Sequence, residues 1–208
     1  MFALLWVSYG TGMARKTEKV VNNGIPWFDD RGEIVNAHGA CIVEENGRYY
    51  LFGEYKSDKS NAFPGFSCYS SDDLVNWKLR NYAVKNIPEA RYAAPQHAQG
   101  IWAPAIRFQN GRFYIYYGMP DEGIYMVRAA DACGQWDAPK LVRAGKGLID
   151  PCPFWDDDGR AYVIHAYANS RIGFKSRIGI FPMSADGTHA IGEDKFLFDG
   201  TANHPTIE

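Results

Sequence analysis

A short phrase occurs three times along this chain of 208 residues. It reads Gly-Arg, one further residue and Tyr, at Gly47–Tyr50, Gly111–Tyr114 and Gly159–Tyr162, and apolar or aromatic residues follow each copy. The copies begin at residues 47, 111 and 159, so they lie 64 and 48 residues apart. A four-stranded propeller blade repeats every 40 to 50 residues, roughly. The repeat therefore predicts an all-β fold whose blades surround one axis.

Strand and turn signals divide each repeat into four expected strands. Runs of β-branched and aromatic residues alternate with turn pairs such as Asn46-Gly47, Asn110-Gly111 and Asp158-Gly159. An open β-sandwich uses similar strands and turns, but the matched order of features in three units favours a propeller. The expected strands are residues 40–43, 49–53, 65–70 and 77–79, then 102–108, 113–117, 123–129 and 141–142, then 152–155, 161–166, 177–183 and 195–198.

Composition and charge narrow the possible partners. The chain is 46% hydrophobic and 15% aromatic, which is enough for a substantial core. Its net charge of −2 argues against non-specific binding to nucleic acid or to an anionic membrane, so we predict neither partner and expect a small neutral or weakly charged ligand. No Cys-x-x-Cys spacing occurs, and we expect free thiols in place of metal ligands. The cysteines are Cys41, Cys68, Cys133 and Cys152.

The first 25 residues are predicted to be a leader or N-terminal extension before a partial propeller domain at residues 26–208. Residues 1–10 are apolar but lack a basic n-region and are too short to span a bilayer. An export-signal remnant, a packed strand and a misplaced start all stay open for this stretch. Blades are expected at about residues 36–85, 100–145 and 148–200, with a fourth beginning at 204–208.

The first strand of every propeller blade lines the central axis, so residues that open each repeat are expected to converge. Two carboxylates, Asp150 and Glu208, then occupy equivalent places on neighbouring blades. The converging segments are residues 36–39, 100–104, 148–151 and 204–208.

A resemblance becomes specific at these segments. Gly147–Tyr162, with Gly100–Ile106 upstream and Thr206–Glu208 downstream, resembles glycoside hydrolase family 43. Tyr50–Glu54 and Cys68–Trp77 are similar to the first blade in the branch that contains exo-acting galactan hydrolases.

The resemblance covers about residues 26–208 and implies a five-bladed β-propeller of which about three blades are present. It also implies cleavage of arabinosyl, xylosyl or galactosyl linkages in plant polysaccharides, generally with inversion. Two blades are therefore expected to be missing, with an uncovered surface on the third blade, and we expect the 208 residues alone to have little or no hydrolase activity.

Inverting hydrolysis needs a general acid on one side of the scissile bond and a general base on the other. The resemblance implies that Glu208 is the acid and that Asp150 is a third carboxylate, which keeps the acid protonated and orients it. For Asp150, an ordinary Asp-Pro turn that opens a strand is the alternative.

The general base is the least defined role. Most family members carry an aspartate at the start of the first inner strand, where this chain reads Ala37-His38-Gly39. His38 is expected in the site, either as the base or only as a contact to sugar hydroxyls, since an imidazole can act as a base near neutral pH. Further candidates for the base are Asp29, Asp30 and Glu54.

Other residues are expected either to bind the sugar or to have a structural role. Trp102 is the predicted stacking platform, and His97, Gln99 and Glu54 are predicted to contact substrate. The run Asp156–Asp158 is interpreted as a hairpin turn and not as a calcium loop. Four more aromatic residues are possible platforms, though core packing is the more usual role of such residues. They are Trp27, Phe63, Phe66 and Trp155.

Together these observations predict a glycoside hydrolase that is extracellular or periplasmic and needs no cofactor. The resemblance allows a central calcium ion, but no site for it is identifiable in the sequence. A carbohydrate-binding propeller without catalysis is the main alternative, and a protein-interaction scaffold is a third possibility.

Overall fold

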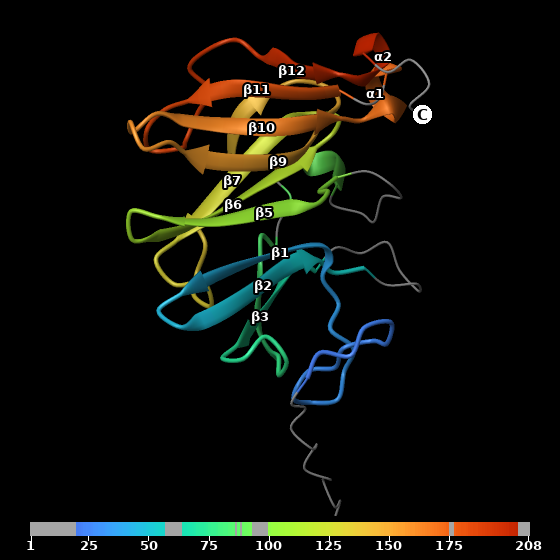
Figure 1. The fold of residues 1–208 in the computed structure, drawn as a ribbon, viewed down its shortest axis with the longest axis vertical. Coiled ribbons are helices and arrows are strands. Elements are labelled where there is room, and N and C mark those ends of the chain that lie inside the picture. Colours follow the sequence, from blue (N-terminus) through green and yellow to red (C-terminus); the bar gives the residue numbers. More distant parts are fainter. Residues whose placement is uncertain are drawn as a thin grey trace, which may run out of the picture.

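The computed structural model describes residues 20–56, 64–85, 87, 89–92, 100–174 and 177–203. These residues form three four-stranded sheets that follow one another along the chain (Figure 1). In each sheet the strands are antiparallel and lie in sequence order, so each sheet is one propeller blade. The all-β, propeller-type prediction is confirmed.

The first sheet contains β1 (His38–Glu45), β2 (Arg48–Glu54), β3 (Phe66–Ser71) and β4 (Lys78–Ala83). The second contains β5 (Pro104–Gln109), β6 (Arg112–Met119), β7 (Gly123–Ala129) and β8 (Lys140–Ala144). The third contains β9 (Leu148–Trp155), β10 (Ala161–Tyr167), β11 (Arg177–Met183) and β12 (Lys195–Asp199). The short helices are a 3₁₀ turn at Ala90–Tyr92, α1 (Asn169–Ile172) and α2 (Gly200–Asn203).

The repeated Gly-Arg phrase marks the same place in every sheet. β2 begins at Arg48, β6 begins at Arg112, and β10 begins one residue after Arg160. In the first two sheets the preceding Asn-Gly pair has positive φ at both residues, 53° and 74° in one turn and 49° and 73° in the other. Two consecutive positive φ angles are typical of a type I′ turn, whose twist matches that of the flanking strands. The phrase therefore reports the first hairpin of each blade.

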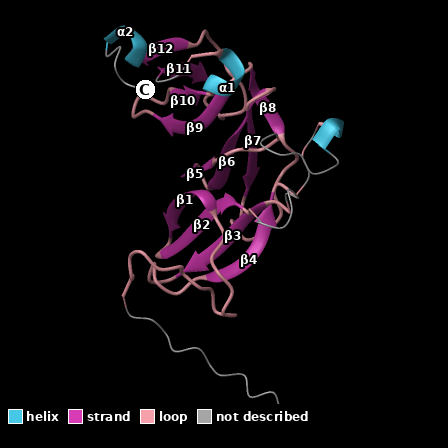
Figure 2. Ribbon diagram, turned by 90° about the vertical axis from the view of Figure 1, so that its right-hand side faces the viewer, coloured by secondary structure: helices cyan, strands magenta, loops and turns pink. Residues whose placement is uncertain are grey.

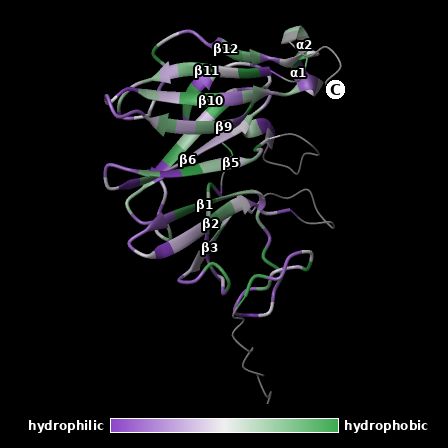
Figure 3. Ribbon diagram, viewed as in Figure 1, coloured by the Kyte–Doolittle hydropathy of each residue, from purple (hydrophilic) through white to green (hydrophobic). Residues whose placement is uncertain are grey.

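Two apolar cores hold the three sheets together. Hydrophobic residues follow the strands, whereas the hairpin turns at one end of the sheets are hydrophilic (Figure 3). Alternate residues of a strand point to opposite faces, so the middle sheet contributes to both cores. The core between the first and second sheets includes Phe52, Phe66, Ile106, Ile115 and Tyr117, and the core between the second and third includes Tyr116, Ile124, Val163, Phe181 and Met183.

No helix in the described part of the chain is long and apolar enough to cross a bilayer. Residues 1–19, which include most of the expected leader, lie outside the described residues.

We predict that Ile115→Ala lowers the free energy of unfolding by about 2 to 5 kcal/mol, because it leaves a cavity in the core between the first two sheets. Ile115 is 0% exposed. Ile191→Ala is the matched control, since 62% of Ile191 is exposed, and it should change stability by no more than about 0.5 kcal/mol. Urea denaturation of both variants measures the difference, and equal effects would contradict this assignment of the core.

Candidate functional site

The segments that open the three sheets lie at the same end of their sheets. β1, β5 and β9 follow one another in space (Figure 2), and their ranges place His38, Trp102 and Asp150 at or just before the start of each strand. Glu54 joins them because β2 runs antiparallel to β1 and ends opposite His38. The entries that carry His38, Trp102 and Asp150 thus lie at the same end of their sheets, Glu54 lies beside His38, and the fourth expected entry, at 204–208, lies outside the described residues.

Glycine allows the first two inner strands to approach closely. A Cβ atom on Gly39 would lie 2.6 Å from the Cβ of Ala103, and one on Gly53 would lie 2.4 Å from the carbonyl carbon of Ala37. Both distances are far below a normal van der Waals contact, so any larger residue would push the backbones apart. The entry to β1 thus passes tightly between the end of β2 and the entry to β5.

A third glycine joins Trp102 to Asp150. The Gly118 carbonyl oxygen accepts a hydrogen bond from the backbone N–H of Trp102 at 2.9 Å. A Cβ atom on Gly118 would lie 3.0 Å from the Cα of Ile149 and 3.7 Å from the backbone nitrogen of Asp150. The relative position of Trp102 and Asp150 is therefore fixed through the backbone of β6.

Asp150 lies in a β-bulge with an unusual backbone conformation. Ile149 pairs with Ala166 and Cys152 pairs with Ile164, so two residues of β9 face a single residue of β10. The φ angle of Asp150 is 50°, a left-handed conformation that costs free energy in residues other than glycine. Bulges re-aim side chains and are over-represented next to active sites.

The first sheet has an equivalent bulge at its entry. His38 pairs with Glu54 and Cys41 with Phe52, so the residue that corresponds to Asp150 is Gly39, with φ of 61°. Glycine adopts this conformation readily. An aspartate at the equivalent place in β9 supplies a carboxylate but strains the backbone. This contrast favours a functional side chain at Asp150 over an ordinary Asp-Pro turn.

The carboxyl group of Asp150 is held at a raised pKa by partial desolvation. The residue as a whole is exposed, so the desolvation affects the carboxyl group while other atoms of Asp150 remain in contact with solvent.

A buried polar cluster lies behind this bulge. His165 faces the bulged residues across the ladder, is 1% exposed, and its Nε2 lies 3.0 Å from Asp194 Oδ1. The Tyr167 hydroxyl donates to Asp194 Oδ2 at 2.6 Å. Burial acts to raise the pKa of Asp194, but the hydrogen bonds from His165 and Tyr167 outweigh it and lower that pKa. The cluster fixes the part of β10 that supports Asp150.

Glu54 is a buried carboxylate between two cationic or titratable groups. Its Oε1 lies 3.8 Å from His38 Nδ1 and its Oε2 lies 3.4 Å from Lys56 Nζ. Burial raises the pKa of Glu54, and the charges and hydrogen bonds of Lys56 and His38 oppose that rise. His38 itself is exposed, so its imidazole is accessible from solvent. The Glu54 carboxylate therefore lies beside His38, which occupies the place where the resemblance implies an aspartate in most members.

Trp102 is half-buried and packs against a residue that the sequence did not reveal. The guanidinium carbon of Arg171 lies 5.8 Å from the centroid of the indole ring. Arg171 belongs to α1, and its Nε donates to Asp121 Oδ1 at 3.0 Å. The helix follows β10 at the same end of the sheets as the site. A helix of four residues is too short to show a helical periodicity in the sequence, so the sequence gives no signal for this contact.

Asp29 and Asp30 lie away from these residues. The backbone N–H of Asp30 donates to the carbonyl oxygen of Trp77 at 3.0 Å, at the start of β4 and hence at the end of the sheet opposite His38. Asp29 is buried, and its Oδ1 accepts hydrogen bonds from the backbone N–H groups of Arg31 and Glu33 at 3.0 and 2.9 Å. Neither aspartate can therefore serve as a base beside His38.

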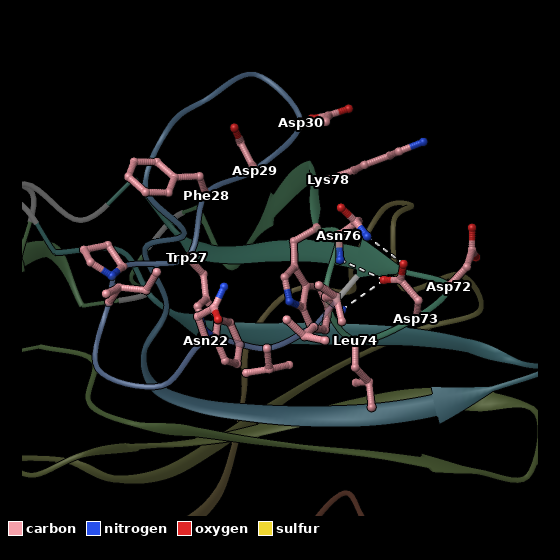
Figure 4. Close-up of a pocket in the computed structure, with 16 residues that line it drawn as sticks. Asn22, Trp27, Phe28, Asp29, Asp30, Asp72, Asp73, Leu74, Asn76 and Lys78 are labelled. Carbon is pink, nitrogen blue, oxygen red and sulfur yellow. Dashed lines mark hydrogen bonds between the residues drawn. The ribbon is translucent and has the colours of Figure 1, made fainter. Parts of the chain in front are cut away.

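Both aspartates line a pocket of about 460 Å³ on the outer side of the first sheet (Figure 4). Trp27 stacks on Trp77 there, with ring centroids 6.5 Å apart and planes 7° from parallel. Asp73, on another side of the pocket, accepts hydrogen bonds from Asn76 and other turn groups that lower the pKa of its carboxyl. The pocket belongs to the turn end of the blade and not to the converging site.

The other residues predicted for the site either pack or hydrogen-bond within the fold, or lie outside the described residues. Phe66 is fully buried and meets Tyr117 edge-on, and Trp155 Nε1 donates to the carbonyl oxygen of Ala185 at 2.8 Å at the far end of β9. The Asp156–Asp158 run lies in the turn between β9 and β10, where Asp158 accepts a hydrogen bond from Arg160. Predicted residues outside the described part are Phe63, His97, Gln99 and Glu208.

The middle of the described inner strands carries two thiols and a guanidinium, which are not the oxygen ligands that calcium prefers. Arg107 of β5 donates from Nη2 to Cys152 Sγ at 3.1 Å, and its charge also acts on Cys41 of β1. Thiols and a guanidinium do not fit a hard cation that takes six to eight oxygen ligands, roughly. Among the described residues no group of three or more His, Cys, Asp or Glu is arranged to hold a metal ion.

Comparison with known proteins decides the family. The model of glycosyl hydrolases family 43 matches residues 38–208. The chain belongs to this family. Its three sheets correspond to part of the five-bladed propeller of solved family members.

Several relatives resemble the family 43 chain. A protein of Xylanibacter ruminicola, named as a candidate β-xylosidase, is 39% identical over 137 residues, which are 65% of this chain and 26% of that protein. An extracellular exo-α-(1→5)-L-arabinofuranosidase of Cellvibrio japonicus is 33% identical over 146 residues, 62% of this chain and 40% of that protein. An exo-β-1,3-galactanase structure from Clostridium thermocellum gives a TM-score of 0.64 at 25% identity, covering 87% of this chain and 41% of that chain.

The chain thus spans between about a quarter and two fifths of the length of these relatives.

We predict that Asp150→Gly is more stable than Asp150→Ala by about 1 to 2 kcal/mol, because alanine pays the steric cost of a positive φ and glycine does not. At Ile149, the neighbouring strand residue, the order should reverse, since glycine weakens ordinary strands. Urea denaturation of the four variants measures this. If glycine is the less stable substitution at both positions, the bulge does not impose the strain described above.

The pKa of Glu54 gives a pH-dependent prediction. The folded chain holds the Glu54 proton more tightly than the unfolded chain, so this contribution stabilises the fold below the ordinary pKa of 4.5 and is lost as pH rises through the raised value. Glu54→Gln removes this titrating group. The difference between the free energy of unfolding of the variant and that of the wild type should therefore shift in favour of the variant as pH rises above 4.5.

Urea denaturation from about pH 4 to about pH 8 measures this gap. Glu193→Gln, at an exposed carboxyl, is the control and should keep a constant difference from the wild type. A constant difference for Glu54→Gln as well would contradict the buried position of its carboxyl.

Proposed function

We propose that this family 43 chain carries part of the active site of a glycoside hydrolase that cleaves xylosyl, arabinosyl or galactosyl linkages with inversion. The observation that carries the proposal is the convergence of Asp150, Trp102, His38 and Glu54 at the entries of three inner strands. The strained conformation and raised pKa of Asp150 support a chemical role for its carboxyl, since such features cluster at functional sites.

In an inverting reaction, a water oxygen attacks the anomeric carbon while a base removes a proton from that water. The bond between the anomeric carbon and the leaving oxygen breaks, and a carboxylic acid donates its proton to that oxygen. We assign the acid to Glu208 and assign Asp150 a positioning role, in which its negative charge raises the pKa of the acid.

For the opposite face, we assign the place of the base to His38, with Glu54 beside it. The 3.8 Å separation of His38 Nδ1 from Glu54 Oε1 allows the carboxylate to orient the imidazole. In this arrangement His38 takes the proton from water or holds a sugar hydroxyl, and Glu54 acts through it. His97 and Gln99 are proposed to contact sugar hydroxyls.

Trp102 is the proposed sugar platform, because an aromatic face packs on the C–H face of a sugar ring and Arg171 fixes the indole. The relatives' names cover xylosides, arabinofuranosides and β-1,3-galactans, and these are the substrate classes we propose. One relative is named as extracellular, which supports an extracellular or periplasmic location.

The test measures hydrolysis of 4-nitrophenyl β-D-xyloside, α-L-arabinofuranoside and β-D-galactoside by the protein that carries this chain. Glu208→Gln should lower kcat by about 100-fold or more. Asp150→Asn should move the alkaline limb of the kcat/KM profile to lower pH, because removing a nearby negative charge lowers the pKa of the acid.

Asp156→Asn, an exposed aspartate at the other end of β9, is the control and should match the wild type. Unchanged rates and profiles for Glu208→Gln and Asp150→Asn would contradict the assigned roles. Saccharide binding that persists in a protein without turnover would favour a carbohydrate-binding propeller instead.

A further inference from the structure

The connection between β7 and β8 packs against the first sheet and is hydrogen-bonded to it. Asn81 of β4 donates from Nδ2 to the carbonyl oxygens of Cys133 and Gly134, at 2.8 and 3.0 Å. Trp136 of the same connection meets Phe52 edge-on, with ring centroids 5.6 Å apart. The second blade is therefore attached to the first by a segment outside the two sheets as well as by the core between them.

Two cysteines lie at this attachment. Cys68 of β3 is 0% exposed and belongs to the core between the first and second sheets, and Cys133 is half-buried in the connection and packs against that core. Cys68 Sγ also lies 3.5 Å from the carbonyl oxygen of Ala132. Asp131 Oδ1 accepts a hydrogen bond from the backbone N–H of Cys133 at 2.8 Å and fixes the turn that presents it.

We propose that Cys133 is a peroxide-reactive thiol and that Cys68 resolves it, so that oxidation forms a disulfide between the first and second blades. The proposal rests on the position of both cysteines at one blade interface, where Cys68 Sγ lies 3.5 Å from the carbonyl oxygen of the residue before Cys133, and on their unequal exposure. A half-buried thiol can meet a small oxidant, and a fully buried thiol beside it can react only with that neighbour.

The charges around the two sulfur atoms give them different roles. The hydrogen bond from Cys68 and the charge of Arg80 lower the pKa of Cys133, while burial and Asp131 oppose this. Arg48 and Tyr50 of β2 also interact electrostatically with Cys133. Burial raises the pKa of Cys68. The thiolate therefore forms on Cys133, which is the attacking sulfur, and the proton stays on Cys68.

The reaction balances in two steps. The Cys133 thiolate attacks one oxygen of hydrogen peroxide, the O–O bond breaks, and the departing hydroxide takes up a proton, which leaves a sulfenic acid and one water. The Cys68 sulfur then attacks the Cys133 sulfur, the S–O bond breaks, and the hydroxide leaves with the Cys68 proton as a second water. Two electrons pass from the thiols to the peroxide.

The remaining cysteines provide matched controls. Burial raises the pKa of Cys41 to about 12, and Cys152 Sγ accepts a hydrogen bond from Arg107 at 3.1 Å. They lie on β1 and β9, the first strands of the first and third sheets, away from the β7–β8 connection. Neither should react with Cys133.

The experiment treats the reduced protein with equimolar hydrogen peroxide, removes the oxidant, denatures the protein and alkylates its free thiols. Peptide mass spectrometry of a non-reduced tryptic digest should find a peptide pair joined through Cys68 and Cys133, with Cys41 and Cys152 alkylated. Cys133→Ser should abolish the link, and Cys41→Ser should retain it. The oxidised wild type should melt about 5 to 15 °C above the reduced form, since the link closes a long loop.

Over-oxidation of Cys133 without a link to Cys68, a link that involves Cys41 or Cys152, or full alkylation of all four thiols would each overturn the proposal. The wild-type digest gives this answer even if a variant folds poorly. The result is also independent of hydrolase activity, so it stands apart from the test of the proposed function.

Discussion

The close approach of the three inner strands is the constraint on which the rest of the structure depends. A side chain on Gly39 would clash with Ala103, and one on Gly118 would crowd the backbone of Ile149. Because neighbouring sheets can pack only when these backbones are close, the same contacts that build the blade interfaces also bring the site residues together. Stability and site geometry therefore depend on a few positions without side chains.

The site carries two unfavourable features that the packed scaffold tolerates. Asp150 holds a positive φ where the equivalent residue of the first blade is Gly39, and Glu54 holds a buried carboxylate whose pKa is raised. Both lie at strand ends, supported by backbone pairing and by the buried cluster around His165. Local strain of this kind persists only where the surroundings fix it, and it is common at sites of chemistry.

Contacts outside the sheets add to the blade interfaces. The β7–β8 connection packs Trp136 and Cys133 against the first sheet, and Arg143 of β8 places its guanidinium 4.8 Å from the ring centroid of Phe181 in the third. These contacts come from segments with weak strand signals. They show that the blades are joined through their outer strands and connections as well as through the inner strands that carry the site.

The sequence by itself determined the all-β architecture and the positions of the strands. The Gly-Arg phrase and the Asn-Gly pairs predict the hairpins because type I′ turns require specific residues at positive φ. The strands can be predicted because their residue patterns are local. The order of the repeats also identified the converging entries at His38, Trp102 and Asp150.

Only the tertiary structure decided which residues meet there. It removed Asp29 and Asp30 from the site because the segment that holds them pairs at the opposite end of the first blade. It added Lys56 and Arg171 to the site and, away from the site, brought Cys68 beside the β7–β8 connection that carries Cys133, and these contacts join residues that are distant in sequence or lie in short irregular segments. Strand periodicity carries no information about contacts between blades. These pairings depend on how whole sheets stack, and the backbone strain at Asp150 depends on a bulge that the ladder of β9 and β10 creates.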